Sequence, residues 1–326
     1  MMERKLDLED RIFSIQSNTE FQKIALEVFH FQLEHCSIYR SFAEQLTKTR
    51  PTKVSEIPFL PISFFKTHEV STSQHYELAF KSSGTTYQQR SSHQVFSKEV
   101  YRRSFKQFYG HCIGNPKEQV ILALLPNYIA QGDSSLVYMV NELINCTASE
   151  LSGFVLGNID EIKARYDQAV SKGKQVIIFG VSYALMDLAE QNLDLSQAII
   201  IETGGMKGRR QELLKEELHK IIRSGTKAKA ILSEYGMTEL LSQGYSDVNG
   251  IFSFPAWMKI LLRDVNDPLS SVSENRSGGI NVIDLANLYS CSFVATQDLG
   301  LLEPHGLKLM GRFDHSDIRG CNLLVQ

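Results

Sequence analysis

The sequence predicts an α/β fold in which a mixed or parallel sheet is covered by helices on both faces. Four short apolar runs are typical of buried strands, and they occupy residues 119–125, 175–179, 197–201 and 228–232. Helical stretches alternate with them at residues 160–172, 182–191 and 207–223. Continuous apolar strands separated by helices are typical of sheets with both faces buried. The chain has 326 residues, 43% of them hydrophobic, which is enough to bury such a core.

The N-terminal part of the chain precedes this alternation and is expected to be helical. Residues 18–47 form the predicted helix, which Asn18 or Thr19 can cap. Its apolar residues recur at helical spacing, namely Phe21, Ile24, Ala25 and Val28. Prolines at positions 51, 58 and 61 then interrupt the chain, so residues 57–65 are expected to be extended. The expected organisation is a helical segment at 1–50, an α/β core at 51–311 and a short tail at 312–326.

Composition and charge argue against several classes of protein. The formal net charge of -3 provides no basic surface of the kind that binds DNA or RNA. No run reaches the roughly 18 consecutive apolar residues of a membrane span, and the charged N-terminus has no apolar signal-peptide core. We therefore expect a cytoplasmic protein that binds no nucleic acid and spans no membrane. The five cysteines form no CxxC pair, which argues against a disulfide framework and a zinc site.

A serine- and threonine-rich segment is the first candidate ligand-binding loop. It comprises Ser82, Ser83, Gly84, Thr85 and Thr86. Glycine lets the backbone approach a ligand closely, and successive N–H groups in such a loop form a site for an anion such as a triphosphate. The spacing differs from that of a Walker P-loop. A polar surface turn is the alternative interpretation when the segment is considered alone.

The second candidate directly follows the predicted strand 228–232, at the edge where ligands bind in parallel sheets. Tyr235 can stack on a purine, and Gly236 allows a sharp turn. Thr238 and Glu239 supply a hydroxyl and a hard carboxylate oxygen, which are ligands that Mg²⁺ prefers. The alternative interpretation is a strand-to-helix turn that Thr238 caps.

The third candidate lies near the C-terminus and consists of an Asp-x-Gly stretch and a Gly-Arg-x-Asp stretch. Asp298 of the first can accept both hydroxyls of a ribose. Arg312 of the second offers a planar fork to a hydroxyl or a phosphate. Considered alone, each is more often a turn residue or a partner in a surface salt bridge.

Together and in this order, the motifs resemble the signature series of the adenylate-forming superfamily, which includes acyl-CoA ligases, luciferases and peptide-synthetase adenylation domains. The resemblance runs from about Ser82 to the C-terminus. Gly204 and Gly205 fall where that superfamily has a glycine-containing nucleotide loop. The resemblance implies the large N-terminal domain of these enzymes. It also implies an activity in which ATP and Mg²⁺, the latter held by Glu239, activate a carboxylic acid as its acyl-AMP.

Further segments are similar to the Lux-type acyl-protein synthetases, which are long-chain-fatty-acid–protein ligases. These segments are residues 57–66, 202–208 and 318–322. The similarity implies that a long-chain fatty acid is activated, moved to Cys321 and handed to a fatty-acid reductase, as in the aldehyde pathway of bacterial bioluminescence, with acyl-transferase proteins as further partners. Only 14 residues, Phe313–Gln326, follow Arg312. The mobile C-terminal domain usual in acyl-CoA ligases is therefore expected to be absent.

Cysteine chemistry is expected to be confined to the tail. Cys321 lies beside Arg319 and near His315, and a nearby cation favours the thiolate that thioester formation requires. The alternative interpretation is a cysteine that packs under Leu323 and Leu324. The other cysteines are expected to fill the core, namely Cys36, Cys112, Cys146 and Cys291.

The chain departs from the superfamily pattern at one position that matters for phosphate binding. Many relatives continue with Gly-x-Pro-Lys after the threonines, whereas here Tyr87, Gln88, Gln89 and Arg90 follow. The usual phosphate-binding lysine is therefore missing from its place. Arg90 is a candidate replacement.

Two other functions remain open on the sequence. One is a phenylacetate-CoA-ligase-like or acyl-carrier-protein ligase, which passes the acyl group to a pantetheine thiol. The other is a non-catalytic relative that binds acyl chains or scaffolds a reductase complex. The adenylating hypothesis requires four separated residues to share one pocket, namely Ser83, Glu239, Asp298 and Arg312.

Overall fold

The computed structural model describes residues 2–47, 49–82, 89–125, 132–155, 157–204, 213–272 and 275–313. These residues form two compact units. Unit 1 takes the described residues up to Glu77, together with Ser91–Phe96 and those from Phe254 onward. Unit 2 takes the described residues of Leu78–Arg90 and Ser97–Ser253. The expected division at residues 50 and 311 remains a prediction.

Unit 2 is built on a mixed sheet that contains all four predicted strands. In spatial order its strands are β10 (Ile251–Ser253), β9 (Gly244–Ser246), β8 (Ala230–Tyr235), β7 (Ala198–Thr203), β6 (Gln175–Val181), β4 (Gln119–Leu124) and β5 (Gly153–Phe154). Strands β8 to β5 in this order run parallel, whereas β9 is antiparallel to both of its neighbours. Every residue of β4 is buried, as expected of a central strand covered on both faces.

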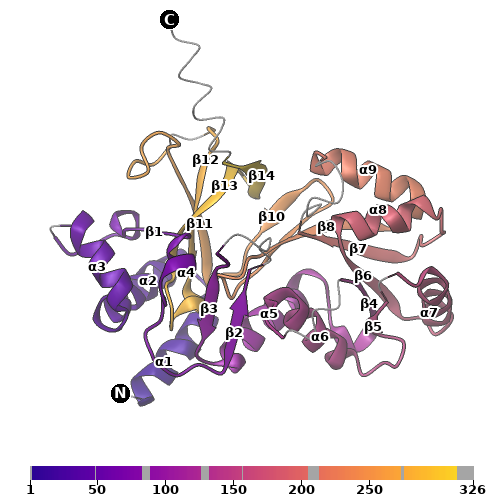
Figure 1. Cartoon of the computed structure of the whole chain (residues 1–326), viewed down its shortest axis with the longest axis horizontal. Coiled ribbons are helices and arrows are strands. Elements are labelled where there is room, and N and C mark those ends of the chain that lie inside the picture. Colours follow the sequence, from indigo (N-terminus) through magenta and orange to yellow (C-terminus); the bar gives the residue numbers. More distant parts are fainter. Residues whose placement is uncertain are drawn as a thin grey trace, which may run out of the picture. The chain divides into compact units, whose positions relative to one another are not determined.

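Helices cover both faces of the unit 2 sheet. They are α5 (Lys98–Cys112), α6 (Ser135–Thr147), α7 (Ile159–Ser171), α8 (Ser182–Glu190) and α9 (Lys215–Thr226), and a 3₁₀ turn spans Pro116–Glu118. Polar caps begin three of them, because Ser97, Ser134 and Asn158 each accept a hydrogen bond from the first helical turn. Figure 1 shows α8 and α9 on one side of the strands and α5 and α6 on the other. Strand β2 (Leu78–Lys81) also belongs to unit 2.

Unit 1 combines an antiparallel sheet with the N-terminal helices. The antiparallel strands of this sheet are β11 (Met258–Arg263), β12 (Gly278–Asp284), β13 (Phe293–Glu303) and β14 (Gly306–Arg312), and β1 (Leu60–Pro61) pairs parallel with β13. Strand β3 (Ser92–Val95) also belongs to unit 1. Its helices are α1 (Met2–Phe13), α2 (Asn18–His35), α3 (Ser37–Leu46), α4 (Phe64–Thr67) and two 3₁₀ turns at Val54–Glu56 and Leu285–Asn287. Alternating burial along β11 shows that one face of this sheet is covered.

The N-terminal region differs from the sequence expectation in three respects. The single predicted helix at 18–47 is two helices, because Cys36 adopts an extended backbone between them. Ser17 caps the first helix in place of Asn18 or Thr19, and its capping box with Glu20 satisfies two N-terminal donors. Residues 57–65 are extended only in part, since α4 begins at Phe64.

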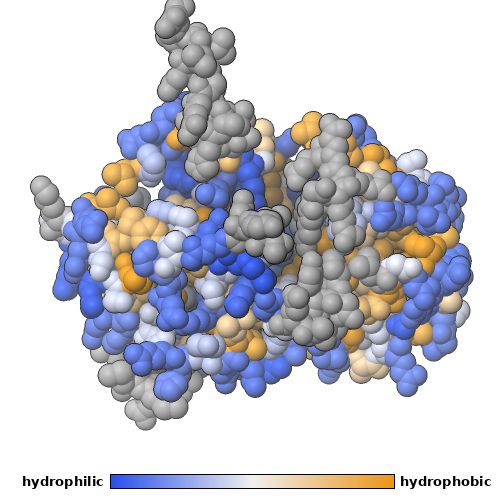
Figure 2. All heavy atoms as spheres, viewed as in Figure 1, coloured by the Kyte–Doolittle hydropathy of each residue, from blue (hydrophilic) through white to orange (hydrophobic). Residues whose placement is uncertain are grey.

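The core of unit 1 is aromatic, and its helices are held to the sheet through it. The ring centroids of Phe29 on α2 and Tyr39 on α3 lie 6.0 and 5.9 Å from that of Phe293 on β13, and all three are fully buried. On the face visible in Figure 2, hydrophilic residues interrupt the apolar ones. Among the described residues, no helix combines the length and apolar character needed to cross a membrane.

Candidate active site

The candidate site of unit 2 lies where three parallel strands end side by side. Strands β6, β7 and β8 have the same direction, so their carboxyl ends meet at one edge of the sheet. Ser182, Gly204 and Gly236 directly follow these strands. Ligands of doubly wound sheets bind at this edge, because helix N-termini and loop backbones converge there. Buried glutamates are the penultimate residues of two of these strands, β7 and β8.

The first glutamate, Glu202 near the end of β7, is held by three donors. Its side chain is only 1% exposed. Ser182 Oγ donates to Oε1 at 2.6 Å, and Ser233 Oγ donates to Oε2 at 2.9 Å. Lys215 Nζ, on the first residue of α9, lies 2.7 Å from Oε2. A buried carboxylate is tolerated when it is paired and hydrogen-bonded in this way.

A histidine completes this first cluster. His219 of α9 lies one helical turn beyond Lys215 and its Nε2 is 3.2 Å from Ser233 Oγ. Burial lowers the pKa of His219 below its usual value. The imidazole is therefore mostly neutral at pH 7, and Lys215 provides the positive charge opposite Glu202.

The second glutamate, Glu234 of β8, has much weaker support. Its side chain is buried, and Thr203 Oγ1 donates to its Oε2 at 2.5 Å. No lysine or arginine within the described part of the chain forms an ion pair with it. Burial raises the pKa of Glu234 to about 7. Burial, and to a smaller extent the charge of Glu234, raise the pKa of Tyr101 on α5 well above its usual value.

The register of the strands places the two glutamates on opposite faces of the sheet. Glu202 is paired with Ser233, and the next pair along the strands is Thr203 with Glu234. Successive side chains of a strand point to opposite faces. The first pair therefore faces Lys215 of α9, and the second faces the side of the sheet covered by α5.

The predicted nucleotide-binding motif occupies the connection between β8 and β9. Tyr235 is the last residue of β8 and is 8% exposed, and its ring lies edge-on to Phe252 at 6.1 Å. Thr238 is half-buried and Glu239 is 6% exposed. The chain continues into an antiparallel strand, so the strand-to-helix turn considered for this motif is wrong.

The backbone or its close neighbours favour glycine at two positions of this edge. Gly204 has φ +72°, a left-handed conformation that favours glycine, and its carbonyl accepts a hydrogen bond from Ser182 Oγ at 2.8 Å. At Gly236 a Cβ atom would lie 2.3 Å from Glu234 Oε1. The carboxylate of Glu234 thus fills the space that a side chain at position 236 would need.

Unit 1 brings together the two predicted residues of the C-terminal motifs. Asp298 on β13 and Arg312 on β14 are direct partners in the strand register. Arg312 Nε lies 3.0 Å from Asp298 Oδ1, and the carboxylate side chain is 9% exposed whereas the arginine is 80% exposed. Cross-strand pairing explains why residues 14 positions apart meet. The prediction that Asp298 and Arg312 act together is consistent with this contact.

Several predicted site residues fall outside the described residues. They are Ser83, Gly84, Thr85, Thr86, Gly205 and Cys321. Ser82 is described, and its backbone carbonyl accepts a hydrogen bond from Arg90. Tyr235, Thr238 and Glu239 belong to unit 2, and Asp298 and Arg312 belong to unit 1. The expectation that these stretches share one pocket remains a prediction.

Sequence reasoning missed the polar residues beneath the motif. Glu202 and Glu234 are acidic residues at the ends of apolar runs, and that signal was available because strand ends hold ligands in this fold class. Lys215 carries no such signal. Its partner Glu202 is 13 positions away and no helical or strand periodicity joins the two. Among the described cysteines, Cys36 and Cys291 are buried and Cys112 and Cys146 are half-buried.

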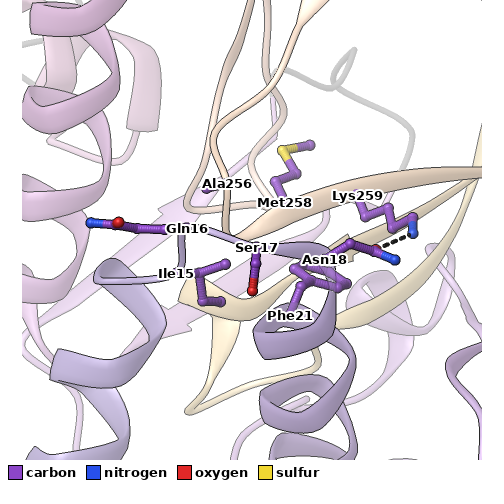
Figure 3. A pocket seen from close by; sticks show the side chains of 8 residues that line it. All are labelled: Ile15, Gln16, Ser17, Asn18, Phe21, Ala256, Met258 and Lys259. Carbon is purple, nitrogen blue, oxygen red and sulfur yellow. Dashed lines mark hydrogen bonds between the residues drawn. The ribbon is translucent and has the colours of Figure 1, made fainter.

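A shallow hollow in unit 1 contains none of the predicted site residues. Its volume is about 240 Å³. Figure 3 shows Lys259, the charged residue of its lining, donating a hydrogen bond to Asn18 Oδ1, at 3.0 Å. The lining comprises Ile15, Gln16, Ser17, Asn18, Phe21, Ala256, Met258 and Lys259. We assign it no role in the chemistry below.

Comparison with known proteins identifies the fold. No family model matches the sequence, and no curated protein is detectably similar to it. An open conformation of 2-hydroxyisobutyryl-CoA ligase in complex with 2-HIB-AMP and CoA matches 92% of this chain and 72% of its own, with a TM-score of 0.65 and 12% identity. An ATP-bound RpMatB–BxBclM chimera matches 72% of this chain and 47% of its own, with a TM-score of 0.53 and 17% identity.

A third match agrees with these two. Apo MatB from Rhodopseudomonas palustris matches 72% of this chain and 47% of its own, with a TM-score of 0.50 and 17% identity. The sequence identities are low, so the similarity concerns the fold. The chain therefore shares its α/β fold, a large mixed sheet covered by helices, with adenylate-forming enzymes such as the acyl-CoA ligases.

Proposed function

We propose that this chain is an adenylate-forming ligase, which uses ATP to activate a carboxylic acid and then transfers the acyl group to a thiol. One observation carries the proposal. A Tyr-Gly-x-Thr-Glu segment stands at the carboxyl end of a central parallel strand, β8. It does so in a fold that matches, over 92% of the chain, a ligase whose structure contains an acyl-AMP.

In unit 2, the proposed nucleotide ligands follow from their chemistry and burial. Tyr235, with Gly204 and Gly205, would contact the adenine, and Thr238 would contact the α-phosphate. The segment Ser82, Ser83, Gly84, Thr85 and Thr86 would contact the outer phosphates. Glu239 would hold Mg²⁺, and a single nearly buried carboxylate fits this ion, which commonly takes one or two carboxylates and the phosphates of its substrate. When bound, the ion supplies positive charge against the phosphates.

In unit 1, Asp298 and Arg312 are the proposed ribose ligands. The carboxylate of Asp298 is nearly buried and fixed on a strand, so it is preorganised to accept hydrogen bonds from two hydroxyls. Arg312 is mostly exposed and remains in contact with that carboxylate through Nε. Its other N–H groups can then reach a hydroxyl or phosphate oxygen.

The proposed first step is an in-line displacement at phosphorus. A carboxylate oxygen of the acid bonds to the α-phosphorus of ATP, and the bond from that phosphorus to the bridging oxygen of pyrophosphate breaks. The electron pair leaves with pyrophosphate, so no protein group needs to donate a proton. The chain's own task is to orient two anions and to surround them with hydroxyl and N–H donors.

The proposed second step transfers the acyl group to Cys321. Its thiolate attacks the acyl carbonyl, the carbon–oxygen bond to AMP breaks, and AMP leaves with the electron pair. Resemblance to the Lux-type synthetases supports a long-chain fatty acid as the substrate. It also supports a fatty-acid reductase, with acyl-transferase proteins, as the partners.

An exchange assay tests the first step. The protein is incubated with ATP, Mg²⁺, labelled pyrophosphate and a panel of fatty acids, and label entering ATP is measured. Glu239→Gln is expected to abolish exchange, whereas Glu44→Gln, exposed on α3, should leave it unchanged. No exchange with any acid, together with no thermal stabilisation by ATP and Mg²⁺, would refute the proposal and favour a non-catalytic acyl-binding relative.

Intact-mass analysis tests the second step. After exposure to ATP, Mg²⁺ and a fatty acid, the wild type should gain the mass of one acyl group that hydroxylamine removes. Cys321→Ser should retain exchange activity but gain no stable acyl group. Loss of exchange in this variant would contradict the division of labour between the two steps.

A pantetheine thiol is the second candidate acceptor. The observation that favours it is the match to a ligase in complex with CoA. In that case incubation with CoA or acyl-carrier protein yields the acyl thioester of the added thiol, and the protein itself stays unlabelled. A labelled fatty acid distinguishes the two acceptors in one experiment, because the label appears either on the protein or on the added thiol.

A further inference from the structure

Arg263, the last residue of β11, extends its side chain across the two neighbouring strands of the unit 1 sheet. Its Nη1 donates to the main-chain carbonyl of Ile280 and to Asn281 Oδ1 on β12, each at 2.8 Å. Its Nη2 donates to the main-chain carbonyl of Thr296 on β13, at 2.5 Å. The half-buried arginine therefore ties β11 to both β12 and β13.

The cross-strand partner of Arg263 is a glycine, which leaves room for this crossing. Gly279 pairs with Arg263 in the register of β11 and β12. A Cβ atom on Gly279 would lie 2.8 Å from Cζ of Arg263 and 2.9 Å from Cζ of Phe313. The Phe313 ring centroid is 5.4 Å from the guanidinium carbon, a distance at which a ring face attracts a cation. The guanidinium and the ring thus share the space beside Gly279.

Strand β13 is irregular at the place that Arg263 reaches. On β12, Ile280 alone lies between the paired residues Gly279 and Asn281, whereas on β13 residues 296–298 lie between their partners. A bulge of this kind interrupts the ladder of main-chain hydrogen bonds and redirects side chains. The guanidinium supplies donors to main-chain carbonyls on both sides of the bulge. The last residue of the bulge is Asp298.

A short series of hydrogen bonds joins the guanidinium to Asp298. The Ile280 carbonyl that accepts from Arg263 also accepts from Thr296 Oγ1, at 2.9 Å. Thr296 Oγ1 in turn accepts from the Asp298 N–H, at 3.1 Å. The two charges also interact, because burial lowers the pKa of Arg263 and the carboxylate of Asp298 opposes this shift. Arg263 thus acts on both the backbone and the charge of Asp298.

We propose that Arg263 is a positioning residue for ribose recognition, which holds the bulge of β13 that presents the Asp298 carboxylate. Phe313, whose ring lies against the guanidinium, directly follows Arg312, so the same cation contacts both strands of the Asp298–Arg312 pair. A planar fork suits this task, because its separate N–H groups reach carbonyls on two strands at once. The inference rests on the proposed function, in which Asp298 and Arg312 bind the ribose.

Calorimetric titration with AMP and with 2′-deoxy-AMP separates this role from a merely structural one. If Asp298 accepts hydrogen bonds from both ribose hydroxyls, the wild type should bind AMP about 10-fold more tightly than the deoxynucleotide. Arg263→Lys keeps the charge but loses the fork, so weaker binding of AMP should reduce this preference to about 2-fold or less. A folded variant that keeps the wild-type preference would overturn the proposal.

Gly279→Ala tests the same contact without a change at Arg263. The added methyl group displaces the guanidinium, which stands at the end of a flexible side chain and can move, so the protein should still fold. The preference for AMP should again decrease. Arg40→Lys is the matched control, because Arg40 on α3 also donates to two main-chain carbonyls, those of Leu33 and Glu34, and should retain the wild-type preference.

A double-mutant comparison tests whether Arg263 acts through Asp298. In an Asp298→Ala background, Arg263→Lys should cause no further loss of AMP affinity, and an additional loss would contradict the proposed route. Failure of the proposed function has a different signature. A wild type that prefers AMP to its deoxy form but catalyses no pyrophosphate exchange refutes the ligase and retains the ribose site. A wild type that binds neither nucleotide refutes both.

Discussion

Glu202 and Glu234 lie on neighbouring parallel strands at the same edge of the sheet, yet their surroundings differ. Glu202 faces α9 and has an ammonium group and two hydroxyls around it. Glu234 faces the opposite side and, among the described residues, has one hydroxyl donor, Thr203. Both are nearly inaccessible to water. The comparison separates two ways of keeping a carboxyl group inside a protein.

The difference lies in what compensates the lost hydration. At Glu202 a cation at 2.7 Å and two hydroxyl donors compensate the carboxyl group for its lost hydration. Glu234 lacks such a cation among the described residues, so the neutral form is favoured and its pKa rises to about 7. We therefore expect Glu234 to titrate near neutrality.

Removal of the Lys215 cation beside Glu202 should have the largest effect on the free energy of unfolding. Lys215→Met leaves the Glu202 carboxylate buried without its counter-charge, which should cost about 4 kcal/mol of unfolding free energy. Urea unfolding at pH 7 measures it. Lys227→Met is the control, because Lys227 pairs with Asp194 on the surface and should change stability by less than about 1 kcal/mol. Equal losses in the two variants would show that Glu202 does not depend on Lys215.

Titration of Glu234 should have the next largest effect. Its pKa is raised from 4.5 to about 7, so the unfolded chain releases this proton at lower pH than the folded protein does. The stability that the neutral carboxyl provides is complete below pH 4.5 and is lost as pH rises through 7. As pH rises through this window, the wild type should therefore lose about 3 kcal/mol of unfolding free energy relative to Glu234→Gln.

The measurement is a series of urea unfolding curves for both proteins between pH 4.5 and pH 8. Thr203→Val is a useful companion, because the Thr203 hydroxyl favours the charged form of Glu234. Its loss should move the pH-dependent window upward. A stability difference that is independent of pH would mean that Glu234 keeps its ordinary pKa.

The close approach of Gly236 to Glu234 should have a smaller effect. Gly236→Ala places a Cβ 2.3 Å from Oε1 and forces the buried carboxyl group to move, which should cost about 1–2 kcal/mol. Gly110→Ala is the matched control, since nothing lies within 4 Å of its Cβ and alanine favours helices. In a Glu234→Ala background the extra cost of Gly236→Ala should disappear.

The Asp298–Arg312 pair of unit 1 should have the smallest effect on stability. Arg312 is 80% exposed, so water screens its attraction for Asp298. Arg312→Ala should therefore change the unfolding free energy by less than about 1 kcal/mol. If the proposed function is correct, the same variant raises the KM for ATP in the exchange assay. A large loss of stability would indicate a structural role for the arginine in place of ribose binding.

The pattern of apolar residues in the sequence was sufficient to predict much of the architecture. Four strands of unit 2, namely β4, β6, β7 and β8, and the helices α7 and α8 were predicted to within a few residues, because central strands are continuously apolar and helices have clear periodicity. The break at Cys36 was missed, because the helical spacing of apolar residues continues from α2 into α3 without interruption. Ser17 was missed as a cap because the adjacent polar residues, Asn18 and Thr19, can cap a helix equally well.

The candidate site was predictable in part, and the limit is physical. Motif residues such as Tyr235 and Glu239 are recognisable because they follow a strand directly. Lys215 and Asp133 are not, since each pairs with a residue far away in the sequence, Glu202 and Arg90 respectively. Nothing local marks such residues, because long charged side chains are common on helix and loop surfaces.

By itself, the sequence determined the alternation of strands and helices, the sheet edge at which ligands bind in this fold class, and the chemical types of the side chains placed there. These follow from local periodicity and from the order of elements along the chain. Only the tertiary structure decided that Glu202 has a cation and that Glu234 has none among the described residues, and that Arg90 pairs with Asp133. The reason is that charge pairing and desolvation depend on which helix covers which face, and that is set by packing across the sheet.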